Sequence, residues 1–293
     1  MAHIANASFS FNLGQGGSTI PMPMPFVSNA RMYTVSAEAE TAWKDLIAHV
    51  AEDAGTVFDY VTYPAPRPLE DLWRRDDLGC VQMCGYPIAL DLADVVPLAS
   101  PIPAASWTGG RALSRTDLIV RDDAPFRTLS DTFGGTVGWT VAHSQSGFNA
   151  LRYHLLPYRS EDRPRLYRRS VGHLVTARQI LDSVVDGRID VGPLDAYWHM
   201  LVRKYLPGLT EKVRILESTE TVLMPAFVTV PAMPRHTVDR LREAFAAAHT
   251  RPWFAPFRAS LLIEGFELVT RGAFLRTLEW ARAAEAEGYL EPA

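Results

Sequence analysis

Along most of the chain, short runs rich in β-branched and aromatic residues alternate with segments of helical periodicity. This pattern limits the folds that the chain can adopt. Such an alternation is typical of βαβ units and of a largely parallel sheet. The runs that we predict to be strands are 31–35, 57–62, 78–83, 117–120, 136–139, 189–191, 213–217 and 226–230. A chain of 293 residues is long enough for about two domains.

The helical segments between these runs carry apolar faces. The longest face recurs at spacings of three and four residues and consists of Ala39, Ala42, Trp43, Leu46, Ile47 and Val50. Ser36 precedes it as a candidate N-cap. Further helices are predicted around 69–74, after Ser146, over 173–185 and 195–205, and twice near the C-terminus.

The strands fall into two groups, which predicts an α/β protein with two lobes. We expect each lobe to be a mixed, mostly parallel sheet flanked by helices. We place a flexible arm at 1–28, lobe 1 at 29–114 plus 226–293, and lobe 2 at 115–225. The chain would then cross twice between the lobes, at two hinges. Open α/β sheets bind ligands outside the carboxyl ends of their strands, so we expect a binding cleft between the lobes.

Composition excludes several classes of partner. The net charge of −4 and the pI of about 6.1 give no basic field for nucleic acid. No apolar stretch approaches the roughly 18 residues of a membrane span, so we expect a soluble chain. Cys80 and Cys84 are four residues apart, which matches neither a zinc nor a redox motif. We interpret them as two buried thiols and predict neither a metal nor a cofactor.

Residues 1–28 lack the cationic start and apolar block of a secretory signal. We therefore expect a periplasmic location if a leader has been removed, and a cytoplasmic one otherwise.

The most informative motif is Ser144-Gln145-Ser146-Gly147, which follows a predicted strand and opens a predicted helix. The backbone N–H groups at a helix start, the helix dipole and two hydroxyls favour a bound anion, and Gly147 would allow its close approach. The alternative is that Ser144 only caps the helix. A nucleophilic serine is disfavoured because the pattern Gly-x-Ser-x-Gly is absent.

Four further residues are candidate ligand contacts. His173 is predicted at the start of a helix, where its imidazole could donate to an oxyanion. Asp195 also opens a predicted helix and is either its N-cap or an acceptor for a protonated group of the ligand. Tyr33 and Tyr86 follow predicted strands of lobe 1, where a cleft wall is expected.

Together these segments resemble the phosphate/phosphite/phosphonate substrate-binding proteins of ABC transporters, within the type 2 periplasmic binding protein superfamily. The resemblance rests on Met32-Tyr33, the stretch 78–87, Ser144–Gly147, Gly172-His173 and the stretch 186–195. It implies that Ser144, Gln145, Ser146 and Gly147 hold the anion, with His173 as a further donor. It also implies that Tyr33 and Tyr86 line the cleft and that Asp195 contacts the non-anionic end of the ligand.

The resemblance implies a solute-binding protein that captures a small phosphonate- or phosphate-like oxyanion, with an ABC transporter permease as partner. Two other functions stay open. One is an enzyme on the same fold, similar to thiamine-precursor enzymes or aromatic-acid decarboxylases, with His143, His173 and Asp195 as acid/base candidates. The other is a cytosolic sensor that reports ligand occupancy to a partner protein.

Overall fold

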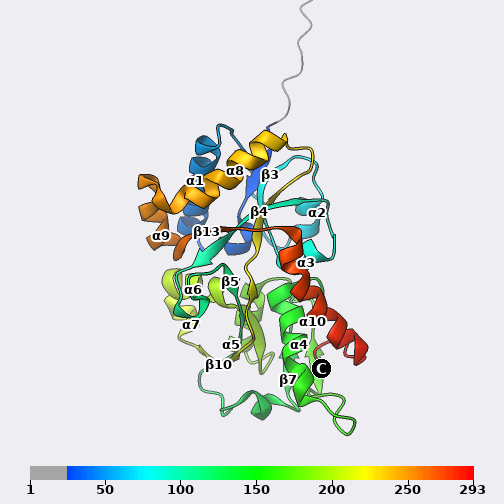
Figure 1. Cartoon of the computed structure of the whole chain (residues 1–293). Coiled ribbons are helices and arrows are strands. Elements are labelled where there is room, and N and C mark those ends of the chain that lie inside the picture. Colours follow the sequence, from blue (N-terminus) through cyan, green and yellow to red (C-terminus); the bar gives the residue numbers. More distant parts are fainter. Residues whose placement is uncertain (1–24) are drawn as a thin grey trace, which may run out of the picture.

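The computed structural model describes residues 25–293, which form two lobes, one above the other in Figure 1. Lobe 1 is built on a six-stranded sheet and lobe 2 on a three-stranded sheet, with a separate two-stranded sheet beside the latter. Residues 1–24 of the predicted arm lie outside the described residues. Its last two residues, Val27 and Ser28, belong instead to a buried strand, so the arm was predicted too long.

The strands of lobe 1 are β1 (Val27–Asn29), β2 (Asp59–Tyr60), β3 (Leu78–Met83), β4 (Val96–Pro103), β12 (Ala226–Thr229) and β13 (Ile263–Leu268). Their order in the sheet is β13-β4-β12-β3-β1-β2. β1 is parallel to β2 and β3, whereas β12 is antiparallel to both of its neighbours. β13 is antiparallel to β4. The sheet is therefore mixed, as predicted, but not mostly parallel, because β12 is reversed where the chain returns from lobe 2 and β13 is antiparallel to β4.

The helices of lobe 1 are α1 (Ala37–Asp53), α2 (Leu69–Trp73), α3 (Gly85–Ala89), α8 (Arg235–Ala247) and α9 (Ala255–Leu261). In α1 the predicted apolar face is the buried face, with Trp43 and Leu46 fully inaccessible. The Ser36 hydroxyl accepts a hydrogen bond from the Ala39 N–H at 3.2 Å, so the predicted N-cap is confirmed.

Lobe 2 contains the strands β6 (Thr116–Arg121), β7 (Thr136–Gly138), β8 (Arg169–Val171), β9 (Gly192–Asp195) and β10 (Val213–Ser218). Its helices are α4 (Ala150–Leu155), α5 (Ala177–Val185), α6 (Ala196–Tyr205) and α7 (Pro207–Thr210). β6 lies antiparallel between β10 and β9, while β7 and β8 are parallel. A parallel bridge from Val137 to Val191 joins β7 to the segment that enters β9.

The lobes are linked by two neighbouring segments. β5 (Leu113–Ser114) and β11 (Val222–Leu223) pair in antiparallel fashion between them, and the chain enters β6 and β12 just after these strands. α10 (Leu275–Ala286) then runs from lobe 1 down beside α4 (Figure 1). Asn149 Nδ2 donates to the Thr277 carbonyl at 2.8 Å. Residues 275–293, which were predicted to belong to lobe 1, pack on both lobes: α10 also contacts α3, and Ala284 and Tyr289 belong to the buried cluster of lobe 2.

Two strands were predicted in the wrong place. The stretch 31–35 is not a strand, because β1 ends at Asn29 and Arg31–Tyr33 form a 3-10 turn. The Asn29 side chain accepts the Arg31 N–H at 2.8 Å, and this local bond starts the turn. The strand expected at 189–191 begins only at Gly192.

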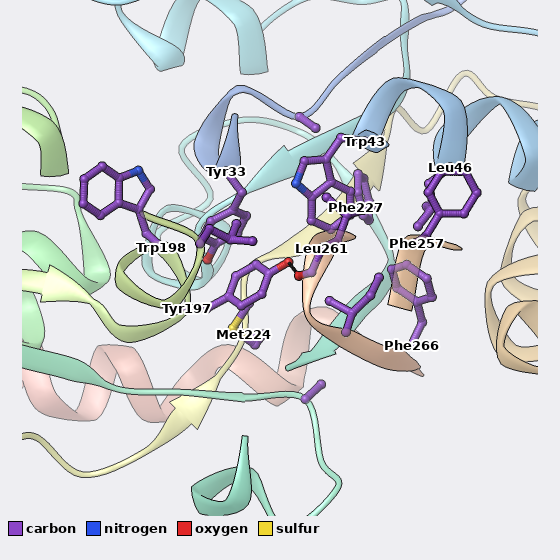
Figure 2. Close-up of a cluster of buried hydrophobic side chains, with 14 of the residues drawn as sticks. Tyr33, Trp43, Leu46, Tyr197, Trp198, Met224, Phe227, Phe257, Leu261 and Phe266 are labelled. Atoms are coloured by element: carbon purple, nitrogen blue, oxygen red, sulfur yellow. Dashed lines mark hydrogen bonds between the residues drawn. The ribbon is translucent and has the colours of Figure 1, made fainter. Parts of the chain in front are cut away.

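A single cluster of buried side chains joins the lobes. Trp43 and Phe227 of lobe 1 and Tyr197 of α6 belong to it, and Figure 2 shows them side by side. The ring of Tyr33 meets that of Tyr197 edge-on at 4.7 Å between centroids. The Tyr197 hydroxyl donates to the Leu261 carbonyl at 2.6 Å. The lobes are thus in contact through packed aromatic side chains and a buried hydrogen bond.

We expect Tyr197→Phe to lower the free energy of unfolding by about 1–3 kcal/mol, because the buried Leu261 carbonyl loses its partner in a site that water does not reach. Urea unfolding followed by tryptophan fluorescence measures the change. Tyr205→Phe is the matched control: Tyr205 donates to the Ser260 carbonyl at 2.8 Å but is only half-buried, so water can replace its hydroxyl. Equal losses in both variants would contradict the prediction.

Candidate functional site

A cleft of about 690 Å³ lies between the two lobes. Lobe 1 supplies the 3-10 turn Arg31–Tyr33, the segment after β2 and the start of α2. Lobe 2 supplies the segment after β7, the start of α5, and Asp195 with α6. The cleft is therefore where the fold prediction placed it, outside the carboxyl ends of β7 and β9.

Several helices begin at this cleft. Thr34 and Val35 precede α1, Ser144 precedes the turn that leads into α4, Thr176 caps α5, and Asp195 caps α6. The positive ends of these helix dipoles point toward a common space and favour a negative charge there.

The predicted turn is present but is organised differently from the expectation. Gln145–Asn149 form one π-helical turn, which continues into α4. The Ser144 hydroxyl accepts the Gly147 N–H at 3.0 Å, so Ser144 is an N-cap. The Gln145 N–H is directed at Cys84 Sγ at 3.4 Å. Ser144, Ser146 and Gly147 line the cleft, whereas Gln145 faces a much smaller cavity behind it.

Gly147 is needed for a reason other than ligand approach. A Cβ at this position would lie 2.0 Å from Thr140 Oγ1 and 2.9 Å from Thr140 Cβ. The Thr140 N–H also donates to the Gly147 carbonyl at 3.0 Å. The glycine thus lets the turn pack directly on the end of β7.

Thr140 itself was missed by the sequence analysis. It follows β7 and lines the cleft, and only 5% of its surface is exposed. Its hydroxyl has no hydrogen-bond partner among the described residues. A buried hydroxyl without a partner is costly, and this one lies beside Gly147. The signal available in the sequence was its position at the carboxyl end of a strand, immediately before the Ser-x-Ser-Gly turn.

Asp195 is the charged centre of the cleft. Its carboxylate accepts hydrogen bonds from the Trp198 N–H at 2.9 Å, the Ser114 hydroxyl at 3.1 Å and the Tyr33 hydroxyl at 3.4 Å. Burial raises the pKa of Asp195 to about 6, against the hydrogen bonds, which act in the other direction. Asp195 is therefore both N-cap and cleft residue, and it titrates in the mildly acidic range.

The structure does not bring His173 and Tyr86 to the cleft wall. α5 begins only at Ala177, and His173 has a left-handed backbone (φ 58°), is exposed and packs on the ring of Trp139. The prediction that His173 starts a helix is wrong, because the chain makes an irregular turn before the Thr176 cap. Tyr86 lies buried in the first turn of α3 and does not line the cleft.

The two lobes touch across the cleft. The Tyr33 hydroxyl bonds to Asp195, the Gln145 N–H approaches Cys84 Sγ, and His143 Nδ1 lies 3.3 Å from Glu70 Oε1. Burial lowers the pKa of His143, while Glu70 opposes that shift. Each pair joins one residue of lobe 1 to one residue of lobe 2, so the lobes are in contact around the cleft.

The two cysteines are free and buried, as predicted. Burial raises the pKa of Cys84 to about 11, so its thiol is protonated at neutral pH and is a poor nucleophile. Within residues 25–293 no group of three or more His, Cys, Asp or Glu side chains is placed to hold a metal ion. No helix of that part of the chain is long and apolar enough to cross a bilayer.

Comparison with known proteins identifies the family. A family model described as the periplasmic substrate-binding protein of phosphonate ABC transporters matches residues 33–272. The chain belongs to this family. It is thus a solute-binding protein of the kind that serves ABC transporters, on the type 2 periplasmic binding protein fold, as the sequence resemblance implied.

Solved structures show the same fold. The binding component of an ABC phosphonate transporter from Pseudomonas aeruginosa is 14% identical, with a TM-score of 0.75 over 90% of this chain and 88% of that one. PhnD1 from Prochlorococcus marinus, solved with methylphosphonate, is 11% identical, with a TM-score of 0.73 over 89% and 98%. A Xanthomonas citri protein solved with chloride is 21% identical, with a TM-score of 0.63 over 90% and 98%. A search of the curated proteins gave no match.

Proposed function

We propose that this phosphonate-binding family member captures a phosphonate- or phosphate-type oxyanion in the interlobe cleft, in the periplasm, and passes it to an ABC transporter permease. The observation that carries the proposal is the hydroxyl of Thr140, buried, without a partner among the described residues and beside the Ser144–Gly147 turn. A ligand oxygen at this point would satisfy it. The methylphosphonate bound to PhnD1 supports the choice of anion.

We call Thr140, Ser144 and Ser146 the anion cradle. Ser144 accepts a hydrogen bond through its oxygen, and its O–H is still able to donate to a ligand. The donors of the cradle are neutral, so the anion is held by dipoles rather than by a salt bridge. Such a site can release its ligand when the lobes separate, because no buried ion pair has to be broken.

Asp195 lies beside the cradle. Thr116 pairs with it across β6 and β9, and the Thr116 hydroxyl donates to the Ser146 carbonyl at 3.2 Å. A protonated Asp195 can donate to a ligand oxygen, while an ionised one can accept from an amine or from a protonated oxygen. The hydrogen bond between Asp195 and the ligand would thus depend on the protonation state of both groups.

The link β5–β11 and the segment before α10 are the places where the lobes can move relative to each other. We propose lobe boundaries near residues 114 and 225, with 275–293 moving with lobe 2. No catalytic step is proposed: His173 is exposed and outside the cleft, and His143 is turned to Glu70.

The test is isothermal titration of the full chain with methylphosphonate and with phosphate. We expect Thr140→Val to weaken binding roughly tenfold, because a hydrogen bond to a charged group is lost, and to leave the melting temperature of the free protein unchanged or higher. Ser106→Ala, at an exposed serine of lobe 1, is the control and should bind normally. Failure of the unmodified protein to bind any oxyanion would refute the proposal.

A further inference from the structure

The cleft is much larger than an anionic head group. Phosphate and methylphosphonate each have five heavy atoms, and at about 30 Å³ for each atom, the share of one water molecule, either fills on the order of 150 Å³. The cleft measures about 690 Å³, which is in the range of pockets that enclose drug-sized organic molecules. Most of the cleft would stay empty around phosphate or methylphosphonate.

This excess volume is not simply the gap of an open conformation. The lobes already touch through Tyr33 and Asp195 at 3.4 Å, and through His143 and Glu70 at 3.3 Å. The aromatic cluster that contains Tyr197 also joins them (Figure 2). Because a packed interface of this kind leaves little room for further approach, closing on a ligand cannot remove most of the volume.

The walls beyond the anion cradle are apolar on both sides. The lining side chains of this kind are Met32, Tyr63, Leu69 and Trp73 from lobe 1, and Val175, Trp198, Val202 and Leu206 from lobe 2. The polar atoms of the Tyr63 and Trp73 side chains are already hydrogen-bonded. The Tyr63 hydroxyl donates to the Pro68 carbonyl at 2.8 Å, and Trp73 Nε1 donates to the Gln82 carbonyl at 3.0 Å. Both rings therefore offer hydrocarbon rather than hydrogen bonds.

Two arginines line the cleft. Arg178 is paired with Asp182 at 2.9 Å. Arg31 donates to the Arg67 carbonyl and lies 5.6 Å from the centre of the Tyr63 ring, contacts that orient its guanidinium and leave its charge in place. Of the two, only Arg178 has a carboxylate partner among the described residues.

We propose that the natural ligand is an organophosphonate or phosphate monoester with a bulky apolar substituent, an aromatic ring or an alkyl chain on the order of ten heavy atoms. The inference rests on the proposed function of the cleft, whose cradle would hold the head group. The substituent would lie between Met32 and Leu69 on one side and Val175 and Leu206 on the other, which are the partly exposed apolar side chains of the lining.

The experiment is a titration of the full chain with phosphate, methylphosphonate, phenylphosphonate and octylphosphonate. Each buried methylene adds about fourfold in affinity, so we expect phenyl- and octylphosphonate to bind at least tenfold more tightly than methylphosphonate. Equal affinities, or tightest binding of methylphosphonate or phosphate, would overturn the inference and leave the proposed function standing. Binding of none of the four would overturn both.

A pair of variants tests the apolar wall. Leu69→Asn places an amide on the wall and should reduce the ratio of octyl- to methylphosphonate affinity severalfold. Leu90→Asn changes an exposed leucine of the same lobe, away from the cleft, and should leave the ratio as in the unmodified protein. A ratio unchanged in both variants would contradict the assignment of the substituent to this wall.

Discussion

Replacing Asp195 with asparagine is expected to remove most of the pH dependence of phosphonate binding and to tighten it by up to about a hundredfold at pH 8. The carboxyl has a pKa of about 6 in the folded protein, raised first of all by burial. Above that pH it is ionised and repels a neighbouring anion; below it, the protonated group donates a hydrogen bond. Two pH units above the pKa, protonating Asp195 costs about a hundredfold in the equilibrium constant.

The free energy of unfolding should also be higher when Asp195 is protonated or replaced by asparagine. Because the folded pKa of about 6 exceeds the ordinary value of 3.8, the folded state binds the proton more tightly. Stability is highest when Asp195 is protonated and falls as the pH rises from about 4 to about 6, by at most ~3 kcal/mol. The amide introduced by D195N would carry no such penalty and would still cap α6. We therefore expect D195N to melt higher than the unmodified protein at pH 8, with the difference about half as large at pH 5 and vanishing below about pH 4.

The measurement is calorimetric titration with methylphosphonate at several pH values between 5 and 8, in both proteins. The phosphonate also titrates in this range, and it does so equally in the two series, so their difference isolates Asp195. Asp94→Asn, at an exposed carboxylate of lobe 1, is the control. For an aminoalkylphosphonate the sign should reverse, because the ionised Asp195 attracts the amine. Parallel pH profiles in D195N and the unmodified protein would refute the role of Asp195.

Gly147→Ala is expected to abolish measurable binding, a loss of a hundredfold or more. The added methyl carbon would lie 2.0 Å from Thr140 Oγ1 and 2.9 Å from Thr140 Cβ. Rotating the threonine side chain relieves the first contact only, so the turn must move away from β7. That movement breaks the hydrogen bond of 3.0 Å from the Thr140 N–H to the Gly147 carbonyl and separates the hydroxyls of the anion cradle. Overpacking of this kind also costs about 1–3 kcal/mol of stability.

Gly208→Ala is the matched control for Gly147→Ala. A Cβ at Gly208 meets nothing within 4 Å and the backbone there is not left-handed, so binding and melting temperature should stay as they are. The double variant G147A with Thr140→Gly restores the space and should regain part of the lost stability. Normal ligand affinity in G147A would show that the turn is not part of the site.

The failures of the sequence analysis have identifiable causes. β4 was missed because Pro97, Pro101 and Pro103 argue against a strand inside a sheet. His173 was assigned to a helix because the apolar pattern of α5 fits a longer segment, but its left-handed backbone leaves the helix to begin at Ala177. Residues 275–293 were predicted to belong to lobe 1, and α10 contacts both α3 of lobe 1 and α4 of lobe 2; a helical pattern does not show which surface the helix covers.

Local chemistry alone was enough to place several of the periodic elements and the starts of three helical segments. β3 matches its prediction at both ends, the apolar face of α1 is the buried one, and Ser36, Ser144 and Asp195 cap helices because their side chains bond to amides three residues on. These features depend on spacing within one segment, which the sequence displays directly. The two-lobed fold was predicted from the grouping of the strands, and the family from the resemblance of several motifs to known members.

Only the tertiary structure decided which of these groups share the cleft. In the folded chain the Thr140 hydroxyl has no partner among the described residues, and burial raises the pKa of Asp195 to about 6. His173 and Tyr86 do not line the cleft. These outcomes depend on packing between segments far apart in the sequence. Burial, desolvation and the shape of a cavity depend on what the other lobe places opposite each residue. That information is contained in no single segment, because it arises only where the two lobes meet.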